Sequence, residues 1–387
     1  MASNTVTPSF SARNNCLTAI SSLVVTVLVA LTVQIFYFSP IDPLVLDIEP
    51  ASSIKNNKLQ NIIKLGEGIL KEPEDVCVDK EGIVYTATRD GWIKRLRRNG
   101  NWENWKHIES ETLLGITGLL KVTEEDGFSV LVSEVNGSQL RLESHTNNSY
   151  ADCFYVLFCS FVPPTAGLLY TCKVTILRFA DDVIEASDGN IYFSIASTKF
   201  DLQHCFLDFL EARPHGKLLK YIPTSNETVI ILDDLTFPNG VALSKDEDYL
   251  VTCETWKCLR HWLKGENKGT TDIFIENLPG GPDNINLAPD GSFWIALLTS
   301  EGLEFVHYSK ITKHLLASFP RLFKLVTGVK KKAMVVNVAT NGKIIRKFDD
   351  DDGKVITFVT SAMEFEDHLY LGSLNSNFIG KLPLHSA

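Results

Sequence analysis

The sequence has no excess of basic residues and none of several common cofactor motifs. Its 37 Lys and Arg against 47 Asp and Glu give a net charge of −10, which argues against nucleic acid as a partner, because phosphate binding needs a basic surface. It contains no Walker loop, GxGxxG fingerprint, HExxH helix or paired CxxC, so no motif indicates a nucleotide, a dinucleotide or zinc. Its 8 cysteines are too few for a disulfide scaffold in 387 residues, and their pairing cannot be read from their spacing.

A long uncharged segment lies near the N-terminus. Residues 16–38 hold no charged side chain, which is long enough to cross a bilayer. Because the segment exceeds the apolar core of a usual signal peptide and lacks a good cleavage site, we interpret it as an uncleaved signal anchor. The alternative is the cleaved signal of a secreted or vacuolar protein. Arg13 before the span and acidic residues after it predict a cytosolic tail at 1–15 and a lumenal body, as in a single-pass type II membrane protein.

Three glycosylation sequons follow the linker at 39–61, and they start at Asn136, Asn147 and Asn226. They agree with a lumenal body, although chance sequons are common and the anchor carries most of the inference. We therefore expect a glycoprotein of the endoplasmic reticulum or vacuole whose membrane contact is the anchor. The sequence does not indicate an oligomeric state.

One pattern recurs four times within residues 62–384: a polar residue, an apolar run, a turn with acidic residues, and a strand with an aromatic residue. The polar and aromatic positions lie ten or eleven residues apart in the pairs Glu74 and Tyr85, Asp181 and Tyr192, Asn239 and Tyr249, and Asp283 and Trp294. Repeats of short strands at intervals of roughly 40–60 residues are typical of a β-propeller. We therefore predict an all-β propeller, with a helical or irregular segment at 315–332 that covers one face.

The four recurring polar residues are predicted to converge. In a propeller the innermost strand of each blade faces the central channel, so equivalent positions lie at the same height. Glu74, Asp181, Asn239 and Asp283 would then form one site. Hard oxygen ligands of mixed charge suit calcium better than zinc. The alternative for each residue alone is a turn cap, because Asp and Asn beside Pro and Gly often have that role.

The chain resembles the plant strictosidine synthase-like family, close kin of the animal adipocyte plasma membrane-associated protein. The resemblance covers 62–138 and 178–384 and rests on FPNGVALSKDEDYLVTCETW, LPGGPDNINLAPDGSFWIAL, GKLLKY and HLYLGSLNSNFIGKL. It implies a six-bladed β-propeller behind an N-terminal signal or anchor, in the endomembrane system or vacuole. The wider superfamily includes gluconolactonases, regucalcin and paraoxonases, which hydrolyse lactones and esters at a calcium in the channel. Its metal motifs fall on the same four residues, with Asp181 where Asn is usual.

Three departures from the family pattern bear on function and on the second blade. The glutamate that catalyses condensation in strictosidine synthase corresponds here to Thr360, whose hydroxyl cannot take a proton from a ring carbon as a carboxylate can. True strictosidine synthase activity is therefore not expected. Segments 115–117 and 118–120 abut where relatives have a turn and a strand, so the second blade is expected to lack its innermost strand. An apolar insertion follows at 139–177, and our hypothesis is that both features mark misassigned splice boundaries.

These observations predict a calcium-dependent hydrolase that acts on a small ester or lactone. The four converging residues are the candidate calcium ligands, and Asp283 or Asp182 is the candidate general base. A non-catalytic binding propeller is the main alternative, because a fold alone does not imply a function. A strictosidine-type condensation in alkaloid biosynthesis is less favoured. The sequence does not name the substrate, and it leaves open whether calcium is catalytic or structural.

Overall fold

The structure of the chain is a computed structural model that describes most of the anchor segment and of the body. The described residues are 10–46, 55–107, 113–118, 129–134, 139–144, 179–225, 227–299, 308–327 and 332–386. The three sequons at Asn136, Asn147 and Asn226 lie outside these residues, as does most of the predicted insertion.

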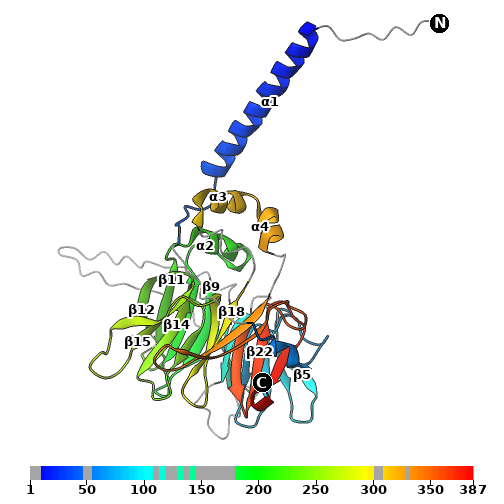
Figure 1. Cartoon of the computed structure of the whole chain (residues 1–387). Coiled ribbons are helices and arrows are strands. Elements are labelled where there is room, and N and C mark those ends of the chain that lie inside the picture. Colours follow the sequence, from blue (N-terminus) through cyan, green and yellow to red (C-terminus); the bar gives the residue numbers. More distant parts are fainter. Residues whose placement is uncertain are drawn as a thin grey trace, which may run out of the picture.

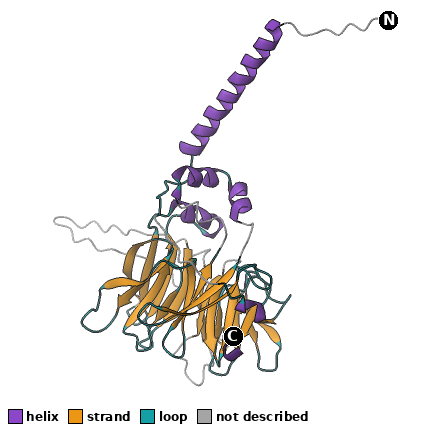
Figure 2. Ribbon diagram, viewed as in Figure 1, coloured by secondary structure: helices purple, strands orange, loops and turns teal. Residues whose placement is uncertain are grey.

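Five sheets of four antiparallel strands form the complete blades of a β-propeller (Figures 1 and 2). The first blade consists of β2 (Val76–Val78), β3 (Val84–Ala87), β4 (Trp92–Leu96) and β5 (Trp102–His107). The next complete blade consists of β9 (Phe179–Glu185), β10 (Ile191–Ser197), β11 (Gly216–Ile222) and β12 (Glu227–Leu235). It is followed by β13 (Val241–Leu243), β14 (Tyr249–Glu254), β15 (Lys257–Trp262) and β16 (Thr271–Ile275). Then come β17 (Gly281–Leu287), β18 (Phe293–Leu298), β19 (Ala333–Val338) and β20 (Ile344–Asp350).

The fifth complete blade joins the two ends of the propeller chain. It consists of β21 (Val359–Phe365), β22 (His368–Ser373), β23 (Ile379–Pro383) and, as its outer strand, β1 (Ile63–Leu65). The register pairs Lys64 of β1 with Gly380 of β23. The short 3-10 helix η1 (Lys58–Asn61) precedes β1 and buries Leu59 in the core of the same region. Because this pairing bridges the first and last strands, it closes the ring.

A three-stranded sheet occupies the place of a sixth blade, so the expectation of six complete blades is corrected to five. This sheet consists of β6 (Leu113–Gly118), β7 (Ser129–Glu134) and β8 (Gln139–Ser144). The expected loss of its innermost strand is also wrong, because β6 contacts the inner strands β2 and β9. The physical reason is that residues 113–118 form one continuous strand across the junction between positions 117 and 118. The outer strand is the one absent from the described part of this sheet, and β8 forms the first six residues of the predicted insertion.

The inner strands form a ring in which each contacts the next, in the order β2, β6, β9, β13, β17, β21 and back to β2. The strands β2, β13, β17 and β21 begin at one end of this ring, which we call the mouth. The second strand of a blade runs antiparallel to the first, so β3, β10 and β18 end at the mouth. Residues that start an inner strand and residues that follow a second strand are therefore neighbours in space.

The recurring aromatic residues lie on the second strands and fill the core between blades. The predicted positions Tyr85, Tyr192, Tyr249 and Trp294 are all buried. Trp294 stacks on Phe348 with ring centroids 5.5 Å apart. Each large ring removes apolar surface from water, which stabilises the packing of adjacent sheets. In four of the blades, the repeat spacing thus corresponds to one polar residue at the mouth and one aromatic residue in the core.

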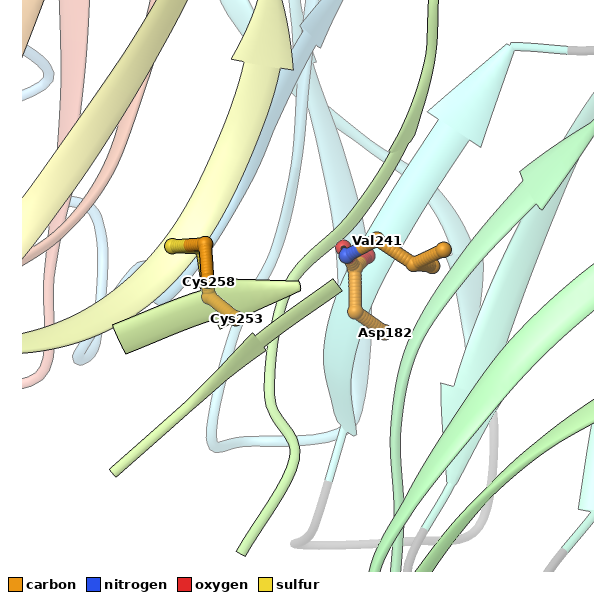
Figure 3. The surroundings of a disulfide bond; sticks show 4 residues. All are labelled: Asp182, Val241, Cys253 and Cys258. Atoms are coloured by element: carbon orange, nitrogen blue, oxygen red, sulfur yellow. Dashed lines mark hydrogen bonds between the residues drawn. A yellow bond between two sulfur atoms is a disulfide. The ribbon is translucent and has the colours of Figure 1, made fainter. Parts of the chain in front are cut away.

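A disulfide joins Cys253 and Cys258 across β14 and β15 (Figure 3). Both residues are fully buried, with a Cα–Cα distance of 4.0 Å. Their directly opposed positions in the antiparallel register explain the pairing, which the sequence alone left open. Cys253 also exchanges backbone hydrogen bonds with Asn239 and Gly240, at 2.8 and 2.9 Å. The disulfide therefore braces the strand beside one predicted ligand.

Helices gather at the mouth (Figure 1). The long helix α1 (Phe10–Phe36) projects away from the propeller, and its Thr18–Phe36 part is long and apolar enough to cross a membrane by length and composition. The propeller itself carries α2 (Cys205–Glu211) after the 3-10 helix η2 (Leu202–His204), and α3 (Lys310–Ser318) and α4 (Pro320–Thr327) between β18 and β19. A last 3-10 turn, η4 (Leu384–Ser386), follows β23. The predicted helical segment at 315–332 thus corresponds to parts of α3 and α4.

Candidate calcium site at the mouth

The four sequence-predicted ligands lie at the mouth ends of four inner strands. Asp181 and Asp283 are the third residues of β9 and β17, and Glu74 and Asn239 come two residues before β2 and β13. All four side chains are buried, with at most 9% exposed. Because the inner strands form a closed ring, residues far apart in the sequence meet at one end of the channel.

Neighbouring acidic charges add to the effect of burial on the pKa values of Glu74 and Asp283. Burial raises the pKa of Glu74 well above its usual value, and the charges of Asp283 and Asp181 raise it further. Burial also raises the pKa of Asp283 well above its usual value, again with a contribution from Asp181. The structure therefore brings the predicted residues together, although no three His, Cys, Asp or Glu side chains within the described ranges are already arranged as a metal site.

Asn239 completes the cluster through its amide. Its side chain hydrogen-bonds to the Asp283 carboxylate, which lowers the pKa of that carboxyl against the effect of burial. A carboxylate only accepts hydrogen bonds, so the amide N–H is the donor and the amide oxygen remains for another partner. This arrangement orients Asn239 as an oxygen donor beside the acidic residues.

Two buried oxygens of the cluster have no hydrogen-bond donor among the residues that the structure describes. They are Glu74 Oε2 and Asn239 Oδ1. The other carboxylate oxygen of Glu74 accepts from Asn284 Nδ2 at 2.8 Å. A buried oxygen without a partner costs free energy, roughly 1–3 kcal/mol and more when it is charged. The two oxygens are therefore suited to a cation or another external partner.

The residues next to the ligands link neighbouring inner strands. Asp75 accepts from Val76 N at 2.7 Å and, in the next sheet, from Ile116 N at 2.9 Å. Asp182 accepts in the same way from Val183 N at 2.7 Å. It also accepts from Val241 N at 2.7 Å, and Figure 3 shows these two residues side by side. Both Asp182 oxygens are thus occupied by backbone N–H groups, which gives this residue a positioning role. The role of general base stays a prediction, and Asp283 is the better candidate for it.

Close backbone approach between blades requires glycine beside two of the ligands. A Cβ on Gly240 would lie 2.5 Å from Ile285 N and 2.7 Å from Asp283 O. A Cβ on Gly372 would lie 2.2 Å from Glu74 O. These distances are far inside van der Waals contact, so a side chain at either position would displace a ligand residue.

Thr360 supports the site from the last blade. Its hydroxyl donates to the backbone oxygen of Glu74 at 2.6 Å, and the neighbouring Ser361 hydroxyl donates to Asp75. Thr360 is fully buried, so it fixes the position of a candidate ligand, Glu74, without offering an acid or base. The nearest carboxylate along the strand, Glu364, accepts a hydrogen bond from Trp294 Nε1 at 2.6 Å. The structure thus gives position 360 a supporting contact in place of a catalytic carboxylate.

Arg89 and Cys205 also belong to the mouth, and the sequence pattern did not single them out. Burial raises the pKa of Asp181 to about 7, and the guanidinium of Arg89 opposes this rise. Burial and the Asp181 charge raise the pKa of the Cys205 thiol to about 12, so it stays protonated at neutral pH. Arg89 closely follows β3, which ends at the mouth, and Cys205 begins α2. Only this position in the topology, and no sequence motif, indicates that the two residues lie near the site.

Comparison with known proteins agrees with this geometry. The sequence model described as strictosidine synthase matches residues 181–266, and the model described as strictosidine synthase-like, N-terminal, matches residues 54–96. The chain is 30% identical to the adipocyte plasma membrane-associated protein of Mus musculus over 98% of this chain and 92% of that protein. It is also 30% identical to strictosidine synthase-like 4 of Arabidopsis thaliana, over 83% of this chain and 81% of that protein.

The chain belongs to the strictosidine synthase-like family. Solved structures with the same fold are more distant in sequence. A gluconolactonase from Xanthomonas campestris superposes with a TM-score of 0.52 at 12% identity, covering 89% of this chain and 96% of that one. A luciferin-regenerating enzyme has a TM-score of 0.52 at 11% identity, covering 83% and 95%. At these identities the two structures confirm the propeller architecture of this family member and nothing finer.

Proposed function

We propose that the protein is a calcium-dependent hydrolase of small esters or lactones whose site lies at the mouth of the propeller. The observation that supports the proposal most is the pair of unpartnered buried oxygens, Glu74 Oε2 and Asn239 Oδ1, within a cluster of buried carboxyls. Carboxylate and amide oxygens are the ligand types that calcium prefers. The residues present therefore fit calcium in charge and in the chemistry of their oxygen atoms.

Glu74, Asp181, Asn239 and Asp283 would hold the ion. Bound calcium would supply a Lewis acid for a substrate carbonyl and lower the pKa of a water. The protein would hold the ion's charge in a buried, water-poor site, where electrostatic stabilisation of a developing oxyanion is strongest. Asp283 is the residue that we propose as proton acceptor. The gluconolactonase and the luciferin-regenerating enzyme show that this architecture hosts small-molecule chemistry in other proteins.

A non-catalytic calcium-binding propeller is the second candidate. The observation that favours it is the scarcity of free acid–base groups at the mouth: Asp182 binds two backbone N–H groups, and Thr360 stands where strictosidine synthase has its glutamate. The same observation disfavours strictosidine-type condensation. Tight calcium binding without hydrolysis of any ester or lactone would support this second candidate.

The proposed location is an endomembrane lumen, the endoplasmic reticulum or vacuole, with α1 as an uncleaved signal anchor. The exposure of the whole Thr18–Phe36 span supports an anchor, and the buried disulfide Cys253–Cys258 agrees with an oxidising compartment. A cleaved signal followed by secretion or vacuolar delivery is the alternative. Alkaline washing of microsomes that contain the full chain separates the two, because only an anchored chain stays in the membrane pellet.

The test of the function is a calorimetric calcium titration of the full chain in detergent, followed by a panel of esters and lactones. Asp283→Ala is expected to lose both binding and turnover. The matched control is Asp246→Ala, an exposed acid in the turn between β13 and β14, which is expected to change neither. Wild-type turnover that survives in Asp283→Ala, or that is the same in calcium and in EDTA, would refute the hydrolase assignment.

A further inference from the structure

An apolar and basic surface lies beside the end of α1. It consists of α3 and α4, which expose Ile311, Phe319 and Leu325, with 64% of Ile311 and 67% of Leu325 exposed to solvent. Tyr37 and Phe38, which directly follow α1, are also exposed. Exposed large apolar side chains that gather in one place mark a contact site more often than isolated ones do. We call α3 and α4 with these side chains the seat.

The charge of the seat is opposite to that of the protein. The two helices span residues 310–327, which contain four Lys and Arg and no Asp or Glu, in a chain whose net charge is −10. Lys310 and Arg321 are exposed to solvent, whereas Lys313 is buried. A helical segment that combines apolar side chains with basic ones, without acidic residues, is typical of binding to the surface of a negatively charged bilayer. Packing against the propeller does not require an excess of basic over acidic residues, so this composition points to an external partner.

The seat is fixed to the end of the predicted membrane span. The Phe36 ring lies 5.5 Å from the His314 ring of α3, and His314 Nδ1 lies 2.8 Å from Ser39 Oγ. Lys313 Nζ donates to Leu44 O at 2.6 Å. Ile41 packs into the same apolar cluster as Leu316. These contacts hold α3 directly below the point where α1 ends (Figure 1).

A second set of contacts ties this connection to the propeller. Glu211 at the end of α2 accepts from Asp42 N at 2.7 Å and from Lys199 Nζ at 2.7 Å. Arg213 donates to Asp42 O at 2.6 Å, and Leu44 N donates to Glu211 O at 2.8 Å. The segment between α1 and the propeller is thus clamped, and the seat has a set position relative to the end of α1.

We propose that the seat is a second membrane contact, which holds the mouth of the propeller against a negatively charged lipid bilayer spanned by α1. The inference rests on the anchor part of the proposed function. If α1 spans a bilayer that ends near Phe36, then α3 lies at the level of the lipid headgroups. There the exposed Lys310 of α3 and Arg321 of α4 meet anionic phosphates, while Ile311 and Leu325 reach the boundary with the acyl chains.

The experiment uses the full chain in lipid nanodiscs that contain a lipid with a photoactivatable group in its acyl chain. Mass spectrometry then maps the labelled peptides. The wild-type chain is expected to be labelled both in α1 and in α3 and α4, and labelling of the seat is expected to rise when phosphatidylserine replaces part of the phosphatidylcholine. Ile311→Asp with Leu325→Asp is expected to reduce labelling of the seat about tenfold, because two apolar groups lose their place in the lipid. Labelling of α1 should not change.

The matched control is Ile273→Asp with Ile345→Asp, two exposed isoleucines on the outer strands β16 and β20. It is expected to leave all labelling as in the wild type. Label in α1 with none in the seat would overturn the inference and leave the anchor standing. No label in α1 would overturn both. Crosslinks between two copies through the seat, with lipid label confined to α1, would also overturn the inference and identify the seat as a protein interface.

Discussion

In calcium-free buffer the free energy of unfolding is expected to fall as the pH rises from about 4 to about 7, and calcium is expected to abolish this loss. Burial raises the pKa of Asp181 to about 7 and that of Asp75 to about 6 in the folded chain. The folded state therefore holds these protons more tightly than the unfolded state does. As the pH passes the ordinary value near 4, the unfolded state releases its protons first, so unfolding becomes more favourable until the folded carboxyls ionise as well.

The magnitude follows from the size of the rise. For Asp181, a rise from 3.8 to about 7 corresponds to about 4 kcal/mol. That is a large part of the roughly 5–15 kcal/mol by which a folded domain is usually stable. At about 2–4 °C per kcal/mol for a large domain, the expected drop in Tm is about 10 °C. Calcium binds the ionised carboxylates of the folded state only, so it should restore the lost stability by mass action.

The assay is scanning calorimetry of the full chain in detergent between pH 5 and 8, in EDTA and in calcium. Asp181→Asn removes the largest of the two titrations with a stated value, so its EDTA curve is expected to be flatter than that of the wild type. Asp246→Asn, an exposed acid away from the mouth, should reproduce the wild-type curve. A wild-type Tm in EDTA that is constant or rises over this pH range would show that ionisation of the buried carboxyls does not destabilise the folded state.

Three further predictions concern single residues of the mouth. Asn239→Ala should weaken calcium binding about tenfold or more in a calorimetric titration, since it removes one oxygen ligand. Asn239→Asp should bind calcium at least as tightly as the wild type. Equal affinity of all three proteins would count against Asn239 as a ligand. Asp182→Asn should lower the free energy of unfolding by about 1–3 kcal/mol in denaturant titrations, because an amide oxygen cannot replace two carboxylate acceptors, and an unchanged midpoint would contradict its bridging role. Gly240→Ala should lose more stability than Gly281→Ala, whose Cβ would meet only Leu298 O at an ordinary 3.9 Å. The same denaturation midpoint for both variants would argue against close packing at Gly240.

The sequence predicts which residues lie together at the mouth because the repeat register carries three-dimensional information. Glu74 and Asp283 are 11 residues before Tyr85 and Trp294, and that spacing corresponds to the length of an inner strand, its turn and the start of the second strand. The polar residue that precedes the aromatic residue at this spacing must then lie at the mouth. The same logic predicts that the four ligands meet without any knowledge of how the blades pack.

Features that depend on pairing between distant strands could not be predicted in this way. The three-stranded sheet has an inner strand because 113–118 forms β6 across the abutting segments, and its neighbours β2 and β9 provide contacts for it. The hydrogen bond from Thr360 to the Glu74 backbone links the first and last blades. A spacing within one repeat carries no information about partners in another, so Thr360 was predicted only to lack a carboxylate.

The buried polar residues at the mouth divide into two groups by their partners, and this division separates structure from function. Asp75 and Asp182 each accept backbone N–H groups from two strands, so their burial is compensated within the protein itself. Glu74 and Asn239 each keep a buried oxygen without such a partner among the described residues. Substitutions in the first group should therefore destabilise the fold equally with and without calcium. Substitutions in the second should remove the stabilisation by calcium, and they should cost little in EDTA. Thermal unfolding of Asp182→Asn and Asn239→Ala under both conditions tests the division. If calcium raises the Tm of Asn239→Ala as much as that of the wild type, Asn239 is not a ligand and the oxygen at the mouth is satisfied in another way.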